Sequence, residues 1–522
     1  MNNISIGTRI FKVTVLISVL SLLSKILGLI RDMALANRFG ATDSNALDAY
    51  FAAIKAPNML FYIISGALAA VVVPVFVEYA TKDKKTEAWS IFNKIFNGVT
   101  LVFILIALLG MFCSPYVVKI CTPGLPPETA ALAAELARVM FPLLLFAGWA
   151  SIFTGLLNAN QVFGIPAFSS AVNNMVIIAG VLLFSSRFGI LGVAYATVFA
   201  MMAMALIQIP SLYRAGYRYK PAWDFSHPGA RQVIILIMPA ALGLTVYQAY
   251  SFIETFLASA LPQGTITVLN FANKLVQFPL GLFVVALGIA AFPTISGMAA
   301  AGEREHYSET VNRLLRVTLL GMLPASVGLM VLSRPVISLF YQSGSFNQHD
   351  TDMTALALLF YAIGLTGQAL NIILTKAFYA IQDTRTPVKI TVVMVFVSLG
   401  FSLCLIRYMQ FSGLALSNSL ASLTGTALFL ILFHKKTAAL SWAGLVKFFA
   451  AVSGATALLA LACVYTNELL PTMINLTGRA GLLLQVVVSV IAGIAVYAAA
   501  IFICRVEEFG ILVRYVRSAL KR

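Results

Sequence analysis

Apolar residues occur in this chain in long runs, and polar residues are mostly confined to short intervals between them. A bilayer hydrocarbon core of ~30 Å needs about 20 consecutive, mostly apolar residues in a helix. Fourteen segments meet this requirement, and we predict that each is a membrane-spanning helix. They cover approximately residues 11–30, 48–79, 90–113, 131–157, 166–185, 188–213, 232–258, 267–299, 311–333, 351–380, 387–406, 412–433, 444–466 and 479–504.

The second and eighth segments are unusually long and contain helix-breaking residues. The second holds Pro57, Gly66 and Pro74, and the eighth holds Pro279, Gly281, Gly288 and Pro293. Breakers inside a span are tolerated where the freed backbone faces protein or a cavity. We therefore predict that both spans are discontinuous helices of the kind found in transporters.

Composition supports a membrane protein. The 522 residues are 60% hydrophobic and 10% charged, whereas a soluble domain is roughly 25% charged. The fold class predicted is an all-α polytopic membrane protein. The net charge of +16 does not indicate a nucleic-acid partner, because most Lys and Arg lie in short loops between spans, where they act as topology signals.

The distribution of basic residues predicts the orientation. With a cytoplasmic N-terminus, 22 of the 35 Lys and Arg fall in inside segments, 7 in outside segments and 6 in or at the edge of a span. This bias predicts that both termini are cytoplasmic and that the number of spans is even. Enzyme motifs are absent, and neither the five Cys nor the four His show metal-ligand spacing. We expect no enzymatic activity, metal or cofactor.

Six cations lie at membrane depth, where each costs at least ~2.5 kcal/mol unless it faces water or an anion. They are Lys25, Lys55, Lys94, Arg138, Lys274 and Lys376. Lys94 and Lys376 are near inner helix ends and can reach the interface, and Arg138 can pair with Glu135. Lys25, Lys55 and Lys274 are the candidates for binding an anion. Lys25 can alternatively reach the interface, and Lys55 can alternatively pair with Asp48 on the same helix. Glu254, the one acid deep in a span, is a candidate either for pairing with Lys274 or for a proton or cation relay.

The two halves of the chain match at specific positions and at nearly the same spacing. The frame Thr154, Ala159, Gln161, Pro166 recurs as Thr375, Ala380, Gln382, Pro387, and Lys55 and Pro74 recur as Lys274 and Pro293. We predict two six-helix lobes in parallel orientation with the substrate site between them. The predicted domains are 1–220 (spans 1–6), 221–436 (spans 7–12) and 437–522 (spans 13 and 14 with a cytoplasmic tail).

Four stretches resemble the MurJ/MviN family, and the similarity covers nearly the whole chain. They are S-K-I-L-G-L-I-R-D (24–32), L-D-A-Y-F-A-A-I-K-A-P-N (47–58), F-A-N-K-L-V-Q-F-P-L-G (271–281) and F-Y-A-I-Q-D-T-R-T-P-V-K-I (378–390). The family are lipid II flippases of the MOP exporter superfamily. The resemblance implies a multi-pass protein of the bacterial plasma membrane, which carries undecaprenyl-diphosphate-MurNAc-pentapeptide-GlcNAc to the outer leaflet for peptidoglycan synthesis and cell shape.

The resemblance also implies a set of substrate-binding residues. It assigns family motif positions to Lys25, Arg31, Asp48 and Lys274, and the duplication adds Lys55. Lys stands at 25 and 274 where the family has Arg, which keeps the charge but loses bidentate geometry for phosphate. The family's E-R-G-x-F loop reads Q-S-G-S-F at 342–346.

We expect alternating access, with the diphosphate headgroup in a cationic cavity and the lipid tail in the bilayer beside spans 13 and 14. The membrane potential favours outward movement of the headgroup by ~2.3 kcal/mol per charge per 100 mV. Coupling to a cation is a second possible source of energy.

The expected partners are lipid II and membrane lipids, and the expected state is a monomer. The residues leave open a flippase for another polyprenyl-diphosphate-linked oligosaccharide, a multidrug cation exporter and a scaffold for cell-wall synthases.

Overall fold

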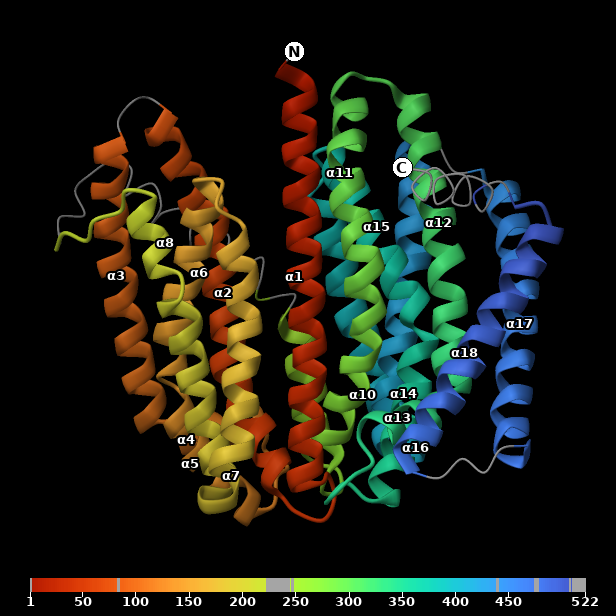
Figure 1. Ribbon diagram of the computed structural model, residues 1–522, viewed down its shortest axis with the longest axis horizontal. Coiled ribbons are helices and arrows are strands. Elements are labelled where there is room, and N and C mark those ends of the chain that lie inside the picture. Colours follow the sequence, from red (N-terminus) through yellow and green to blue (C-terminus); the bar gives the residue numbers. More distant parts are fainter. Residues whose placement is uncertain are drawn as a thin grey trace. The chain divides into compact units, whose positions relative to one another are not determined.

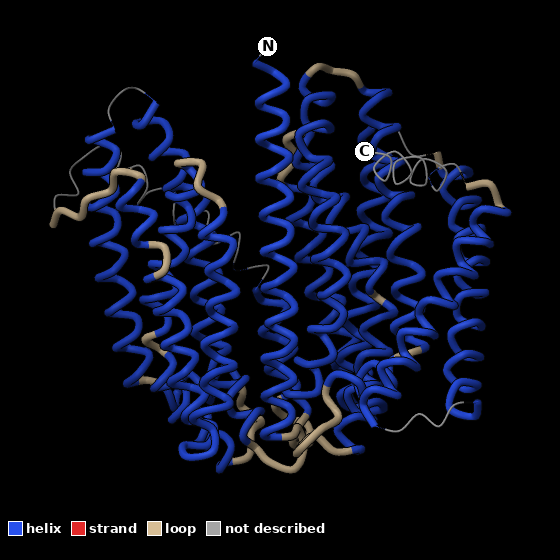
Figure 2. The backbone as a smooth tube through the Cα atoms, viewed as in Figure 1, coloured by secondary structure: helices blue, strands red, loops and turns tan. Residues whose placement is uncertain are grey.

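The computed structural model describes residues 2–81, 85–221, 245, 248–437, 441–473, 478–506 and 508. Every regular element in these ranges is a helix, and none of them is a strand (Figures 1 and 2). The predicted all-α class is confirmed. The chain divides into two compact units, Met1–Thr267 with Ser343–Phe346, and Val268–Gln342 with Asn347–Arg522.

The first unit, red to yellow in Figure 1, is a bundle in which α1 packs on α7, and α2 packs on α5 and α6. A further helical segment covers residues 248–258. The labelled helices are α1 (Asn2–Phe39), α2 (Ala46–Thr81), α3 (Lys85–Phe112), α4 (Ser114–Cys121), α5 (Pro127–Met140), α6 (Leu143–Ala159), α7 (Gly164–Leu206) and α8 (Ile209–Arg214).

The second unit, green to blue, repeats this bundle and adds two helices. Its elements are α10 (Thr265–Pro279), the π-helical segment η1 (Leu280–Val284), α11 (Val285–Ala300), α12 (Arg304–Val331), α13 (Ser333–Phe340), α14 (Gln348–Ile363), α15 (Leu365–Ala380), α16 (Arg385–Thr437), α17 (Trp442–Met473) and α18 (Gly478–Ile503). Helix α17 packs on α18 and on α12. Tyr497 of α18 donates a hydrogen bond to the Leu320 carbonyl of α12 at 2.7 Å.

Helix lengths and boundaries recur between the two units. Helices α3 and α4 recur as α12 and α13, with the same lengths of 28 and 8 residues and the same spacing between them. The connection after α13 is slightly longer than the connection after α4, so the helices that follow it are shifted a little further along the chain. This recurrence agrees with the internal duplication that the sequence predicts, and two six-helix lobes remain a prediction.

Helices α7 and α16 are too long for one bilayer crossing, at 43 and 53 residues. Each contains a residue with non-helical backbone angles, Gly189 (φ 56°) and Gln410 (φ 49°). A methyl group on Gly180 would overlap Cβ of Ala196, although 16 residues of straight helix span ~24 Å. The chain therefore reverses near Gly189, and Gln410 is the matching break in the second unit. The predicted boundary between spans 11 and 12 contains Gln410, and the predicted boundary between spans 5 and 6 lies two residues before Gly189.

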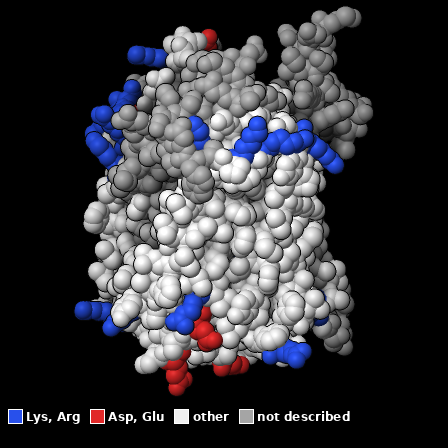
Figure 3. Space-filling view, turned by 90° about the vertical axis from the view of Figure 1, so that its left-hand side faces the viewer, with Lys and Arg blue, Asp and Glu red and all other residues white. Residues whose placement is uncertain are grey.

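Seven helices among the described residues are long and apolar enough to cross a membrane, or up to nine if each bent helix pair is one span. The bent pairs are α5 with α6 (46°) and α14 with α15 (43°), which were predicted as single spans. Figure 3 shows Lys and Arg near the two ends of one face, with a broad uncharged band between them among the residues drawn in colour. Fourteen spans remain a prediction.

Of the two spans predicted to be discontinuous, the eighth is locally distorted, but its helix continues through the distortion from Thr265 to Ala300. In the eighth span, Pro279 ends α10 and a π-helical segment follows it, as expected where a helix is locally distorted. The second span instead forms one helix over Ala46–Thr81, so the prediction of a discontinuous helix is wrong there. A proline removes one N–H and kinks a helix, and the residues around Pro57 and Pro74 keep helical geometry despite it.

Candidate functional site

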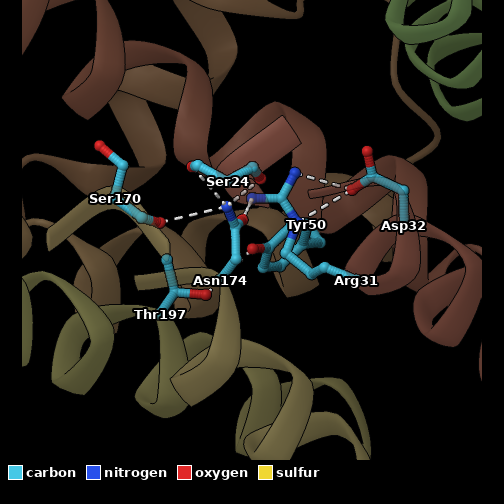
Figure 4. A network of polar contacts seen from close by, with 7 residues as sticks. All are labelled: Ser24, Arg31, Asp32, Tyr50, Ser170, Asn174 and Thr197. Atoms are coloured by element: carbon cyan, nitrogen blue, oxygen red, sulfur yellow. Dashed lines mark hydrogen bonds and ion pairs between the residues drawn. The ribbon is translucent and has the colours of Figure 1, made fainter. Parts of the chain in front are cut away.

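Arg31 lies near the end of α1 in a polar network between three helices (Figure 4). Its Nε and NH2 donate to Oδ1 of Asp32 at 2.9 and 2.7 Å. The Asp32 side chain is only 4% exposed, and that of Arg31 is 20% exposed. The guanidinium is therefore held beside a buried carboxylate, and the charge of this predicted binding residue is locally compensated.

Asn174 of α7 holds a second edge of the same guanidinium. Arg31 NH1 donates to its Oδ1 at 3.2 Å. The amide nitrogen of Asn174 donates back to the Ser24 carbonyl of α1 at 3.0 Å and to the Ser170 carbonyl at 3.2 Å. Asn174 is buried. Through these hydrogen bonds it links the Arg31 guanidinium to the backbone of α1.

The third helix of this network is α2, which contributes Tyr50. Its hydroxyl and that of Thr197 of α7 lie 3.0 Å apart, and both residues are buried. Tyr50 is close enough to interact electrostatically with both Arg31 and Asp32. Helices α1, α2 and α7 thus meet at one polar point inside the first unit (Figure 4).

Lys55 of α2 occupies a separate position in the first unit. Its Nζ donates to the Ser251 hydroxyl at 2.6 Å, and it interacts electrostatically with Glu254, one turn further along residues 248–258. The structure thus brings together the predicted binding residue Lys55 and the predicted relay residue Glu254. A cation and a carboxylate placed together are less costly at membrane depth than either alone.

Asp48 is enclosed and hydrogen-bonded rather than open to solvent. Its Oδ2 accepts from the Gly264 backbone N–H at 2.6 Å, and its Oδ1 accepts from the N–H and hydroxyl of Thr267 at 2.9 and 2.6 Å. The residue is 3% exposed. A carboxylate at a helix N-terminus satisfies backbone donors that have no partner within the helix. Asp48 therefore anchors the start of α10, and its contact with substrate remains a prediction.

The remaining intramembrane cations have diverse surroundings. Lys25 is partly buried on α1, six residues and thus ~9 Å of helix rise before Arg31. Lys274 is exposed on α10 in the second unit. Lys376 lies over the Phe292 ring, with Nζ 5.6 Å from its centroid. Arg138 is exposed on α5, and Lys94 is partly buried on α3.

The F-Y-A-I-Q-D-T-R-T-P-V-K-I stretch forms the junction between α15 and α16. Asp383 accepts from the Thr386 N–H at 3.0 Å and from its hydroxyl at 2.6 Å. It also pairs with Lys436, at the far end of the α16 hairpin. Burial alone would raise the pKa of Asp383, but hydrogen bonds from Lys436 and Thr386 lower it to about 2. This stretch therefore holds the two ends of the hairpin together.

Sequence reasoning missed Asn174 and Ser251 because it searched the spans for charges. Neutral amides and hydroxyls are common in membrane helices and give a weaker signal. The adjacent pair Asn173 and Asn174 inside an apolar run was the available sign, since a buried amide needs hydrogen-bond partners. Among the described residues, no group of three or more His, Cys, Asp or Glu could hold a metal ion.

The arrangement of helices matches known transporters. A solved MATE-family multidrug resistance transporter of the MOP superfamily, in an inward-facing conformation, aligns with a TM-score of 0.71 at 13% identity, over 82% of this chain and 98% of that chain. The fold is therefore that of MOP superfamily transporters. A solved lipid II flippase MurJ in an inward closed conformation aligns with a TM-score of 0.77 at 25% identity, over 93% of this chain and 98% of that chain.

Sequence comparison resolves the family within this fold. The family model described as "Lipid II flippase MurJ" matches residues 35–478. A probable lipid II flippase MurJ of Buchnera aphidicola subsp. Acyrthosiphon pisum (strain APS) is 32% identical over 419 residues, which are 79% of this chain and 82% of the relative. The chain belongs to the MurJ family of lipid II flippases, a family of transporters.

Proposed function

We propose that this chain carries lipid II from the inner to the outer leaflet of the bacterial plasma membrane and catalyses no chemical reaction. The observation that carries this proposal is the match to the MurJ family model over residues 35–478. The same match separates the chain from multidrug exporters, whose fold it shares at much lower identity.

Lys25, Arg31, Lys55 and Lys274 are the residues proposed to engage the diphosphate headgroup. A diphosphate offers several acceptor oxygens, and charge-assisted hydrogen bonds to it are stronger than neutral ones. The fixed position of the Arg31 guanidinium between Asp32 and Asn174 supports this role, because a donor oriented in advance loses less entropy on binding. Asp48 supports the site indirectly by anchoring the start of α10.

Transport proceeds in this proposal by alternating access of the two repeats, with both termini cytoplasmic. The membrane potential draws the anionic headgroup outward. Glu254, which interacts electrostatically with Lys55, is the candidate for coupling to a proton or another cation. The protein works as a monomer and needs no bound cofactor.

Reconstitution into vesicles tests the function. The purified full chain is placed in proteoliposomes with fluorescent lipid II, and the fraction reached by an impermeant quencher is followed with time. We expect faster exposure than in protein-free vesicles, loss of that gain in Lys25→Ala, and retention in Lys94→Ala, a cation predicted to lie at the interface. Equal rates with and without protein would refute the proposal. Transport of a different polyprenyl-diphosphate oligosaccharide in the absence of lipid II transport would identify the alternative flippase.

A further inference from the structure

A single residue of α7, Asn174, contacts one face of α1. Ser24, Gly28 and Arg31 follow one another at intervals of four and three residues, so they lie along the same face of the helix. Asn174 contacts Ser24 and Arg31 through hydrogen bonds. A Cβ on Gly28 would make ordinary van der Waals contact with the Asn174 amide, 3.7 Å from its nitrogen, so the Asn174 side chain also lies next to Gly28. Ser24, Gly28 and Arg31 thus form one contact face of α1 for Asn174.

The chemistry of the contacts defines how the amide is oriented. A guanidinium only donates hydrogen bonds and a backbone carbonyl only accepts them. The Asn174 oxygen therefore faces Arg31, and its NH2 group faces the carbonyls of Ser24 and Ser170, as the structure has it. The reverse orientation would oppose donor to donor and acceptor to acceptor. Asn174 consequently satisfies both partners in one orientation only.

We propose that Asn174 is a positioning residue for the headgroup-binding Arg31. Asp32 holds the Nε and NH2 edge of the guanidinium, and Asn174 holds NH1, so the plane is restrained from two directions before any ligand arrives. Asn174 is neutral, so it orients the cation without a second negative charge that would repel a diphosphate. Through Ser24 it also ties this orientation to the backbone beside Lys25. The inference rests on the proposed function, because it assigns Asn174 a role in binding the same headgroup.

A double-mutant cycle tests the inference. The dissociation constant for lipid II is measured on the full chain in detergent for wild type, Asn174→Ala, Arg31→Ala and the double variant, together with the melting temperature of each. We expect Asn174→Ala to weaken binding roughly tenfold, the effect of losing one hydrogen bond to a charged group. In the Arg31→Ala background, Asn174→Ala should have no further effect on binding, because it acts only through that guanidinium.

A matched control is the neighbouring Asn173→Ala. Asn173 is equally buried, at 8% exposed, and its amide nitrogen has no hydrogen-bond partner among the residues that the structure describes. We expect this variant to bind lipid II as wild type does. If Asn174→Ala does not fold, Asn174→Ser replaces it, since the shorter hydroxyl does not reach NH1.

The outcomes separate this inference from the proposed function. Loss of affinity in Arg31→Ala with wild-type affinity in Asn174→Ala would overturn the positioning role alone. Additive losses in the double variant would also overturn it, because a general structural defect does not depend on Arg31. Wild-type affinity in Arg31→Ala would instead remove Arg31 from the proposed headgroup site.

Discussion

Gln161 and Gln382, which hold the same place in the two repeats, adopt the same left-handed backbone conformation, with φ of 60° and 59°. Each lies just beyond a helix, α6 or α15, and the residue after each closes the helix end. Val162 N–H donates to the Leu157 carbonyl at 2.8 Å, and Asp383 N–H donates to the Phe378 carbonyl at 3.0 Å. The duplication therefore extends to individual backbone hydrogen bonds.

Glycine at these two turns should stabilise the protein. Left-handed backbone geometry costs a residue with a side chain about 1 kcal/mol, whereas glycine adopts it freely. Gln161→Gly and Gln382→Gly are each expected to raise the melting temperature in detergent. Gln277→Gly, at an exposed site within α10, is the control and should lower it, because glycine destabilises a helix interior by about 1 kcal/mol. A fall in all three variants would contradict the turn assignment.

Asp383→Asn should destabilise the α16 hairpin by roughly 1 kcal/mol, because it weakens the ion pair with Lys436 and the hydrogen bonds to Thr386. The pKa of Asp383 in the folded protein is about 2, below its ordinary value of 3.8. The contribution of the Asp383 carboxylate to the free energy of unfolding is therefore complete above pH ~4 and is lost as the pH falls from about 4 to about 2. Melting temperatures of wild type and variant across this window should converge toward acid pH.

The control for this prediction is Asp352→Asn. Asp352 pairs with Arg334 at 2.9 Å, but the two side chains are 49% and 62% exposed, and solvent-exposed pairs contribute little. Its melting temperature should match that of wild type at every pH. If Asp352→Asn lowers the melting temperature as much as Asp383→Asn does, the lower exposure of Asp383 does not explain its contribution to stability.

Asp48→Ala should loosen the start of α10. It leaves the buried N–H groups of Gly264 and Thr267 without their acceptor, which costs about 1–3 kcal/mol. Faster hydrogen exchange at residues 264–267, together with a lower melting temperature, is the expected result. Asp352→Ala removes a carboxylate whose side chain is 49% exposed and should leave hydrogen exchange at residues 264–267 unchanged. Wild-type exchange in Asp48→Ala would show that α10 does not depend on this anchor.

Lys25→Arg should preserve growth of a strain depleted of its own lipid II flippase, whereas Lys25→Ala should not. Arginine keeps the positive charge and adds a bidentate edge for phosphate, while alanine removes the charge. Complementation is scored with protein levels matched by immunoblot. Normal growth with well-expressed Lys25→Ala would exclude a requirement for this cation.

The sequence predicted the fold where physical constraints are local. The apolar runs located the α7 and α16 hairpins, and the recurring T-x4-A-x-Q-x4-P frame coincides with the repeated turns at Gln161 and Gln382. The continuous α2 was not predicted, because whether Pro57 interrupts a helix depends on packing around it. The bends between α5 and α6 and between α14 and α15 were missed for the same reason.

The site was predicted only in part. Charge at membrane depth singled out Lys25 and Lys55, and the family motif singled out Arg31. Their partners could not be read from spacing, because Asn174 is 143 residues from Arg31 and Ser251 is 196 residues from Lys55. The family motif assigned Asp48 to the substrate site, and its hydrogen bonds to Gly264 and Thr267 could not be read from that motif.

The most direct test of lipid II translocation is the accessibility of lipid II in each leaflet of cells depleted of this protein. Cells are treated with an external enzyme that cleaves lipid II only at the outer surface, and the cleaved and intact pools are measured. If this chain is the flippase, depletion should shift lipid II from the cleaved to the intact pool, and re-expression of wild type, but not of Lys25→Ala, should restore cleavage. An unchanged cleaved fraction after depletion, in a strain with no second lipid II flippase, would contradict the account.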